Sequence, residues 1–320
     1  MQSRAFGLEF ETAFPISGLP PARQSLDGEA TTVELTSTAA LEQAWRDAKP
    51  TRLEDSHDAD GRLLLAIDWD DSLGFKLTAP EWGEYLLSAD GRNLRCAPPE
   101  LESWRRDRFL TARALPLAAT MRGLEVFHAS AVSLGGAVVA IVGPRHIGKT
   151  SLAVNMVLRG GTFLTDDLLA LEAEEDRIVA HPGAAVMGVR EAEYNLIDPE
   201  QRARLGQFVQ RMDKFFAEVA REDRPLPLRI VYFVDRRRQN TELAIEEMRD
   251  ADPRLLLASS FFNGIVNSPE RSLAQLDLCS RLSQTTTLCR AMVPPSVGAG
   301  SLAESLADHA RATIGTPDGT

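Results

Sequence analysis

The sequence predicts an α/β protein in which a phosphate-binding core follows a strand-rich N-terminal region. Residues 1–100 contain short alternating or apolar stretches separated by turn signals, a pattern typical of strands. From about Val126 onward, short apolar stretches alternate with helical patterns, as they do in α/β folds. Within this second part, residues 143–150 read GPRHIGKT and directly follow the apolar stretch AVVAIV. Together these observations indicate a nucleotide-binding α/β core.

The composition limits the kinds of protein that this chain can be. The 320 residues are 44% hydrophobic and 25% charged, which is typical of a globular protein with two domains or one large one. No apolar stretch reaches the roughly 20 residues that span a bilayer, and the N-terminus lacks a secretion signal, so we expect a cytoplasmic protein without membrane contact. The net charge is −11 and the basic residues are scattered, which argues against nucleic acid as a partner. The oligomeric state stays open, with a homo-oligomer among the options.

The first part of the chain is expected to form a separate strand-rich domain. Strands are expected at its most regular stretches, residues 5–11, 63–67 and 85–87. Pro98 and Pro99 then interrupt the pattern, and a helical pattern follows over residues 100–122. The expected limits are 1–100 for the strand-rich domain, 101–123 for a connecting helix, 124–313 for the P-loop α/β domain and 314–320 for a frayed tail.

The second part alternates strands and helices. Strands are expected at residues 137–142, 162–165 and 228–234. Apolar residues at helical spacing predict an amphipathic helix over 199–219. The other helices are expected at 149–159, 252–265, 270–284 and 301–313.

The segment 143–150 matches the pattern G-x-x-x-x-G-K-[ST] in full. Gly143 and Gly148 permit backbone angles and close approaches that a side chain would block. The loop can then turn successive N–H groups inward, and the following helix N-terminus adds partial positive charge, so phosphates bind there. Lys149 can reach the β- and γ-phosphate oxygens and the Thr150 hydroxyl can bind Mg²⁺, so the expected cofactors are ATP and Mg²⁺. Further nucleotide contacts are expected from Arg145, His146, Ile147 and Ser151.

Two adjacent carboxylates follow the helix after this loop. Asp166 and Asp167 end the strand expected at 162–165. Such a pair is often a solvated turn or a helix cap. Beside a phosphate loop, however, one carboxylate can hold Mg²⁺ while the other accepts a proton from an attacking hydroxyl.

Three stretches resemble one family of kinases. Residues 127–132 (FHASAV), the loop, and residues 159–167 (RGGTFLTDD) resemble the core of HPr kinase/phosphorylase-related proteins. The resemblance covers about residues 124–171 and more loosely reaches 190. It implies an HPr serine kinase-like P-loop domain akin to the nucleotide domain of phosphoenolpyruvate carboxykinase.

The resemblance also implies roles for individual residues. Asp166 would be the proton acceptor, Asp167 the carboxylate on the Mg²⁺ side, and His128 a polar neighbour of the reacting phosphate, with Lys149 completing the catalytic set. Enzymes that act on HPr have a Gly/Ser-rich loop, whereas this chain carries Arg145 and His146. Their later Ile-Arg-Gly-Leu-Gly signature is matched only approximately, by the stretch MGVR at 187–190.

These departures argue against HPr as the acceptor. Relatives of this shorter type include kinases that phosphorylate a hydroxyl on a peptide from natural-product gene clusters. The leading hypothesis is therefore an ATP-dependent phosphotransferase with a Ser/Thr hydroxyl of a peptide or protein as acceptor, which Arg145 and the arginines at 236–238 could grip if it is acidic. A kinase of a small-molecule hydroxyl, or a nucleotide-binding regulatory module with slow ATPase, remain alternatives. The paired aspartates favour a kinase, since a binding module needs no proton acceptor.

Overall fold

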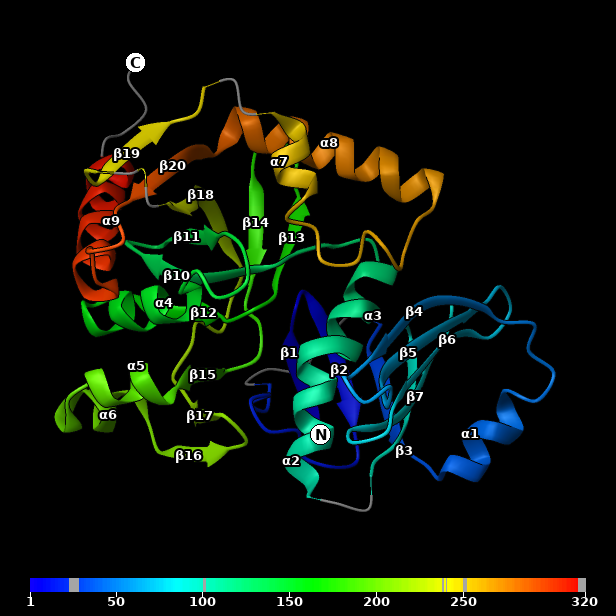
Figure 1. The fold of residues 1–320 in the computed structure, drawn as a ribbon. Coiled ribbons are helices and arrows are strands. Elements are labelled where there is room, and N and C mark those ends of the chain that lie inside the picture. Colours follow the sequence, from blue (N-terminus) through cyan, green and yellow to red (C-terminus); the bar gives the residue numbers. More distant parts are fainter. Residues whose placement is uncertain (23–28, 100–101, 238, 240, 250–251, 316–320) are drawn as a thin grey trace. The chain divides into compact units, whose positions relative to one another are not determined.

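The protein is a mixed α/β structure with several sheets (Figure 1). The computed structural model describes residues 1–22, 29–99, 102–237, 239, 241–249 and 252–315. The chain forms two compact units, which are described separately. One comprises Met1–Val126 with Phe262–Ser272, and the other comprises Phe127–Phe261 with Leu273–Thr320. The domain limits expected from the sequence stay a prediction.

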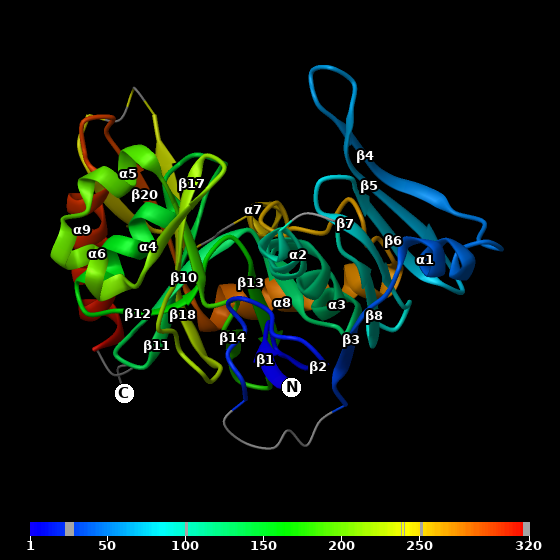
Figure 2. The ribbon, with the colours of Figure 1, turned by 90° about the horizontal axis from the view of Figure 1, so that it is seen from below.

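In the first unit, the described residues form one eight-stranded sheet in the order β1-β2-β3-β8-β7-β6-β5-β4. Its strands are β1 (Gln2–Ala5), β2 (Leu8–Thr12), β3 (Thr31–Leu35), β4 (Thr51–His57), β5 (Leu63–Asp70), β6 (Gly74–Ala79), β7 (Gly83–Leu87) and β8 (Asn93–Ala97). Figure 2 shows β4 and β5 as a long twisted ribbon at one edge of this sheet. The strands expected at 63–67 and 85–87 are confirmed within β5 and β7. The expected strand at 5–11 is confirmed only in part: Leu8–Glu11 lie in β2, whereas Phe6 and Gly7 form the turn of the β1–β2 hairpin, with positive φ of 53° and 78°.

One helix of this unit lies between β3 and β4, and the other helical segments follow β8. They are α1 (Thr38–Ala44), α2 (Ser103–Phe109), the π-helical turn η1 (Leu110–Ala114) and α3 (Leu115–Met121). The helical pattern expected over 100–122 is confirmed by α2, η1 and α3, and its first two residues lie outside the described part. The ring of Phe109 stacks on Tyr85 of β7 at a centroid distance of 4.5 Å, so α2 packs on the sheet.

The second unit is built on a mixed sheet of nine described strands. The order is β12-β10-β11-β18-β14-β13-β9, with β20 beside β18 and β19 beside β20. The strands are β9 (Glu125–Phe127, at the unit boundary), β10 (Ala129–Leu134), β11 (Ala137–Val142), β12 (Thr162–Thr165), β13 (Leu169–Ala173), β14 (Ile178–His181), β18 (Leu226–Arg236), β19 (Ala244–Glu247) and β20 (Thr287–Val293). The strands expected at 137–142, 162–165 and 228–234 are confirmed as β11, β12 and part of β18.

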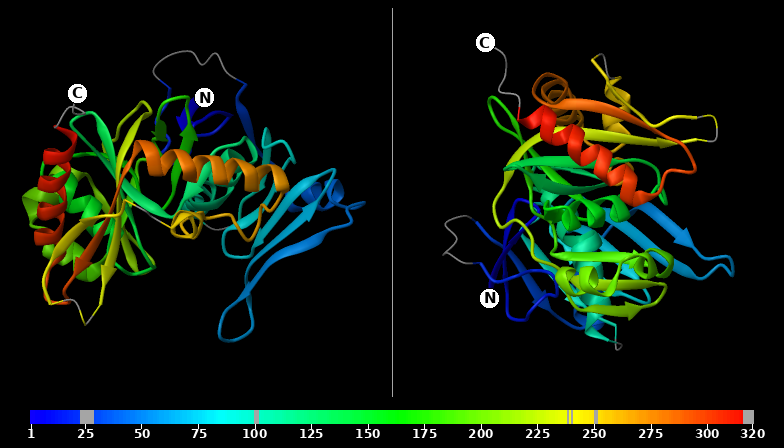
Figure 3. Two further views of the ribbon diagram at one scale, coloured as in Figure 1. Left: turned by 90° about the horizontal axis from the view of Figure 1, so that it is seen from above. Right: turned by 90° about the vertical axis from the view of Figure 1, so that its left-hand side faces the viewer.

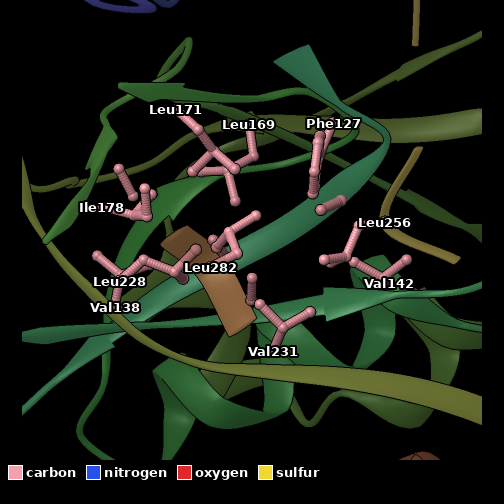
Figure 4. Packing of buried hydrophobic residues seen from close by; sticks show 14 of the residues in the cluster. Phe127, Val138, Val142, Leu169, Leu171, Ile178, Leu228, Val231, Leu256 and Leu282 are labelled. Atoms are coloured by element: carbon pink, nitrogen blue, oxygen red, sulfur yellow. The ribbon is translucent and has the colours of Figure 1, made fainter. Parts of the chain in front are cut away.

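Both faces of this sheet are covered, which explains why β11 is apolar at every position. Val138, Ala140 and Val142 point into one core, which Leu278 and Leu282 of α8 (Pro269–Thr285) complete. Figure 4 shows this core at close range, with the labelled side chains converging from several strands.

The other face of the sheet packs against two helices. Val139 and Ile141 belong to this second core, together with residues of α4 (Lys149–Leu158) and α9 (Ala299–Ile314). Figure 3 shows α9 running across the strands, with α4 next to it. The helices expected at 149–159, 270–284 and 301–313 are therefore confirmed as α4, α8 and α9. Of the expected tail, residues 316–320 lie outside the described part.

The amphipathic helix expected over 199–219 is wrong. The chain forms α6 (Pro199–Leu205), then the hairpin β16 (Phe208–Arg211) and β17 (Lys214–Glu218), which pairs with β15 (Val186–Arg190) in a three-stranded sheet. Gly206 ends the helix with φ of 138°, and a Cβ there would lie 2.5 Å from the carbonyl oxygen of Glu218. The apolar residues of this segment therefore lie on two paired strands and not on one helix face. This small sheet and α5 (Glu191–Leu196) pack on α4 through a core that contains Val154.

The helix expected over 252–265 is also largely wrong. Only α7 (Pro253–Leu257) is helical there. The chain then pairs with the sheet, since Ser260 forms an antiparallel bridge with Phe127. Among the described residues, no helix is both long and apolar enough to cross a membrane.

Candidate functional site

The segment 143–150 connects the end of β11 to the start of α4. Gly148 caps α4 in the left-handed region, with φ of 99°, a conformation that disfavours a side chain. At Gly143 the constraint is space, because a Cβ would lie 3.1 Å from Ile147 and 3.2 Å from the carbonyl oxygen of Val234. Ile147 itself packs against the core beneath α4. Close packing therefore requires a glycine at 143, whereas the backbone angle favours one at 148. The N–H groups of the first turn of α4 remain available to anions.

Lys149 is buried, and its ammonium group turns back into the loop. Its Nζ donates to the carbonyl oxygens of Gly143, at 3.0 Å, and Pro144, at 3.4 Å. Burial lowers the pKa of Lys149, and the nearby carboxylates of Asp167 and Asp166 oppose part of this lowering. Both carboxylates are thus close enough for their charge to act on the lysine.

Asp166 is the carboxylate that meets the loop directly. The Thr150 hydroxyl donates to it, 2.9 Å from Oδ1 and 3.1 Å from Oδ2. The Ser130 hydroxyl donates to the same Oδ1 at 2.7 Å. Hydroxyl and carboxylate oxygens are the ligands that Mg²⁺ prefers. Thr150 and Asp166 are therefore suited to hold this ion at the start of α4.

Asp167 follows in the left-handed conformation, with φ of 68°, which a non-glycine residue adopts at an energetic cost. Leu168 then donates its N–H to the Asp166 carbonyl oxygen at 2.9 Å, so the turn after β12 is tight. Both carboxylates act on the pKa of Lys149, so the turn leaves the two of them near the buried lysine.

His128 lies just before β10. Its N–H donates to the carbonyl oxygen of Ser259 at 2.7 Å, and its ring meets Phe261 edge-on at a centroid distance of 5.8 Å. Arg145 is exposed at the tip of the loop. The contacts described above connect Lys149 to Gly143 and Thr150 to Asp166, and the charge of Arg145 is close enough to act on Lys149. His128 stands two residues before Ser130 in the chain, and the contacts given above for it are with Ser259 and Phe261.

A contact that the sequence did not predict ties the loop to the small sheet. The Ser151 hydroxyl donates to Oε1 of Glu193 in α5, and Oε2 of Glu193 accepts the N–H of Arg190 at 3.2 Å. The guanidinium of Arg190 lies 2.7 Å from Nδ1 of His146, which has a positive φ of 68°. The segment 190–193 thus contacts the loop at His146 and the first turn of α4 at Ser151. Glu193 is 42 residues from Ser151 and carries no local sequence signal.

Arg236 ends β18 and Arg237 follows it, and both have structural partners. Arg236 donates to the carbonyl oxygen of Val297 at 2.7 Å, and Nε of Arg237 pairs with Asp235 at 2.7 Å. Arg238 lies outside the described residues. Asp235 stands near the carboxyl end of β18, the parallel neighbour of β11.

A polar pocket of about 560 Å³ lies at the opposite end of β18. Arg229, Glu247, Arg249 and Thr287 are among the residues that line it. Its described lining contains none of the residues expected to bind nucleotide or metal, so the pocket is separate from the loop.

Within the described ranges, no three His, Cys, Asp or Glu residues gather into a metal cluster. A Mg²⁺ ion at Thr150 and Asp166 would need further ligands from phosphates and water. That is the usual mode of binding for this ion in enzymes that act on nucleotides. The residues present therefore fit a nucleotide-bound Mg²⁺ better than a metal held by protein alone.

Comparisons with known proteins add little at the level of sequence. No protein-family model matches this chain, and no curated protein matches it. Among solved structures, the chain is similar to the HPr(Ser) kinase/phosphatase from Coxiella burnetii, with a TM-score of 0.33 and 11% sequence identity. The match covers 60% of this chain and 99% of that chain. A likeness at this level does not show a shared family.

Proposed function

We propose that the protein is an ATP-dependent phosphotransferase of the HPr kinase-like type, which moves the γ-phosphoryl group to a Ser/Thr-type hydroxyl of a peptide or protein. The observation that carries this proposal is the hydrogen bond from Thr150 to Asp166 at the first turn of α4. It brings a metal-ligating hydroxyl and a carboxylate together beside a loop whose glycines and free N–H groups suit phosphates. Binding alone would not require a second carboxylate.

The contacts favour different roles for the two aspartates. Asp166 is the metal ligand beside Thr150, because its carboxylate accepts a hydrogen bond from the Thr150 hydroxyl. Asp167 then takes the proton of the acceptor hydroxyl. This order is the reverse of the one that the family resemblance implied.

Lys149 supplies the mobile cation of the site. When bound, Mg·ATP supplies the transferable phosphoryl group and the positive charge of the metal. The Lys149 ammonium, now on the carbonyls of Gly143 and Pro144, would exchange these neutral acceptors for phosphate oxygens. A charge-assisted bond is stronger than one to a neutral carbonyl, so the exchange favours binding.

The assay follows ATP consumption and product mass together, with candidate peptides encoded beside the gene as acceptors. We expect slow ATP hydrolysis alone and efficient transfer when the cognate peptide is added. Lys149→Ala should lose about ten- to hundred-fold in ATP affinity by calorimetry. Lys214→Ala, on β17, is the matched control and should bind like the parent.

Two outcomes would contradict the proposal. Rapid hydrolysis to ADP and free phosphate, unchanged by any candidate acceptor, would indicate an ATPase or a nucleotide-operated module. Transfer to a small metabolite in preference to every peptide would keep the chemistry but replace the acceptor class.

A further inference from the structure

One face of β10 is apolar except at its end near the loop. Val132 and Leu134 point into the core under α4 and α9, and Ser130 occupies the next position of the same face. Ser130 is fully buried, with 0% of its surface exposed. An alanine of nearly the same size would fill this space without a polar group, so packing gives no reason for the hydroxyl.

The Ser130 hydroxyl has a specific partner across the sheet. It donates to Oδ1 of Asp166 at 2.7 Å, and Thr150 donates to the same oxygen at 2.9 Å. A carboxylate held by one donor can rotate about its last bond. Two donors that converge on one oxygen from different elements, β10 and α4, fix the rotation of the carboxylate plane.

We propose that Ser130 is a positioning residue for the metal-side carboxylate: it orients Asp166 so that Mg²⁺ binds at the first turn of α4. The inference rests on the proposed function. Ser130 acts through Asp166, to which it donates a hydrogen bond, and takes no direct part in nucleotide binding. Partners of this kind, which orient a metal ligand, typically change metal affinity by about 10–100-fold when removed.

The test is the Mg²⁺ dependence of nucleotide binding in Ser130→Ala and Ser130→Cys. Both replacements fit the space, and neither supplies a strong O–H donor. The binding of a non-hydrolysable ATP analogue is titrated by calorimetry with and without Mg²⁺. We expect the Mg²⁺ concentration for half-maximal binding to rise about ten-fold, with affinity in the absence of Mg²⁺ unchanged.

The same strand offers a matched control. Ser133 is also buried, points to the other face and donates to Glu222. Ser133→Ala should leave the Mg²⁺ dependence at the parent value, and the thermal midpoint of each unliganded variant reports whether it folds.

Three results would overturn the inference. One is a Mg²⁺ titration of Ser130→Ala that matches the parent. Another is an equal loss of affinity with and without Mg²⁺, which would mean a general structural role. A parent protein that binds no nucleotide at any Mg²⁺ concentration would instead refute the proposed function, and the inference with it.

Discussion

Replacing Asp166 by asparagine tests the separate roles proposed for Asp166 and Asp167. The amide keeps one oxygen, so the hydrogen bonds from Ser130 and Thr150 to Oδ1, at 2.7 and 2.9 Å, can persist. What is lost is the negative charge and the second oxygen, 3.1 Å from the Thr150 hydroxyl. The fold should survive the change, because the side chain stays almost the same size.

The size of the effect follows from these contacts. A hydrogen bond or ligand bond to a charged group contributes about 1.5–3 kcal/mol, which is about ten- to hundred-fold in an equilibrium constant. Asp166→Asn should therefore weaken Mg²⁺-dependent nucleotide binding by this factor and leave Mg²⁺-free binding nearly unchanged. Asp167→Asn should instead lower the rate of transfer by about 10²–10⁴-fold, with the Mg²⁺ requirement of the parent.

Two measurements on the same variants decide the matter. Calorimetry gives nucleotide affinity against Mg²⁺ concentration, and single-turnover transfer at saturating Mg²⁺ gives the rate. If Asp167→Asn shifts the Mg²⁺ requirement and Asp166→Asn does not, the assignment is reversed. Parent-like behaviour of both variants would refute a catalytic role for the pair.

Three further predictions follow from the structure. Burial lowers the pKa of Lys149, so nucleotide affinity should fall as the pH rises through that pKa and the ammonium loses its proton. Because the Asp167 carboxylate opposes the lowering, Asp167→Asn should move this fall to lower pH. Calorimetry from neutral to alkaline pH measures the shift, and identical profiles for parent and variant would show that the carboxylate does not act on the lysine. Glu193→Ala removes the hydrogen bonds from Ser151 and from the N–H of Arg190, so it should lower the free energy of unfolding by about 1–2 kcal/mol in urea titrations. Glu191→Ala, at an exposed position, should change this free energy little, and equal effects of the two variants would contradict this account. Burial raises the pKa of Cys96 to about 12, so iodoacetamide at mildly alkaline pH should modify it only after unfolding; fast modification of the native protein, detected by mass spectrometry, would show that the thiol is accessible.

Local sequence patterns determined much of the second unit. The strand at 137–142, the loop and the helix from Lys149 could be read directly, because each depends on neighbouring residues alone. A fully apolar strand needs cover on both faces, and glycines at fixed positions need particular backbone angles. These requirements are local, and the structure satisfies them.

Local patterns failed where pairing between distant residues decides the outcome. Phe208, Phe215 and Phe216 have the spacing of a helix face, yet they belong to a hairpin. Gly206 stops the helix, and β15 offers an edge with which β17 can pair. Apolar spacing over one segment cannot distinguish a helix from two short strands when the partner strand lies elsewhere in the chain.

The site shows the same division between local and tertiary information. The residue types were evident from the sequence: a lysine and a threonine after glycine, and two aspartates after the next strand. Only the tertiary structure decided that Asp166 is the carboxylate that meets Thr150, that Ser130 donates to the same carboxylate, and that Glu193 of α5 contacts Ser151 in the first turn of α4. Hydrogen bonds require a few tenths of an ångström in position, and that accuracy comes from the packing of β10, β12 and α4 against one another, which no single segment of the sequence encodes.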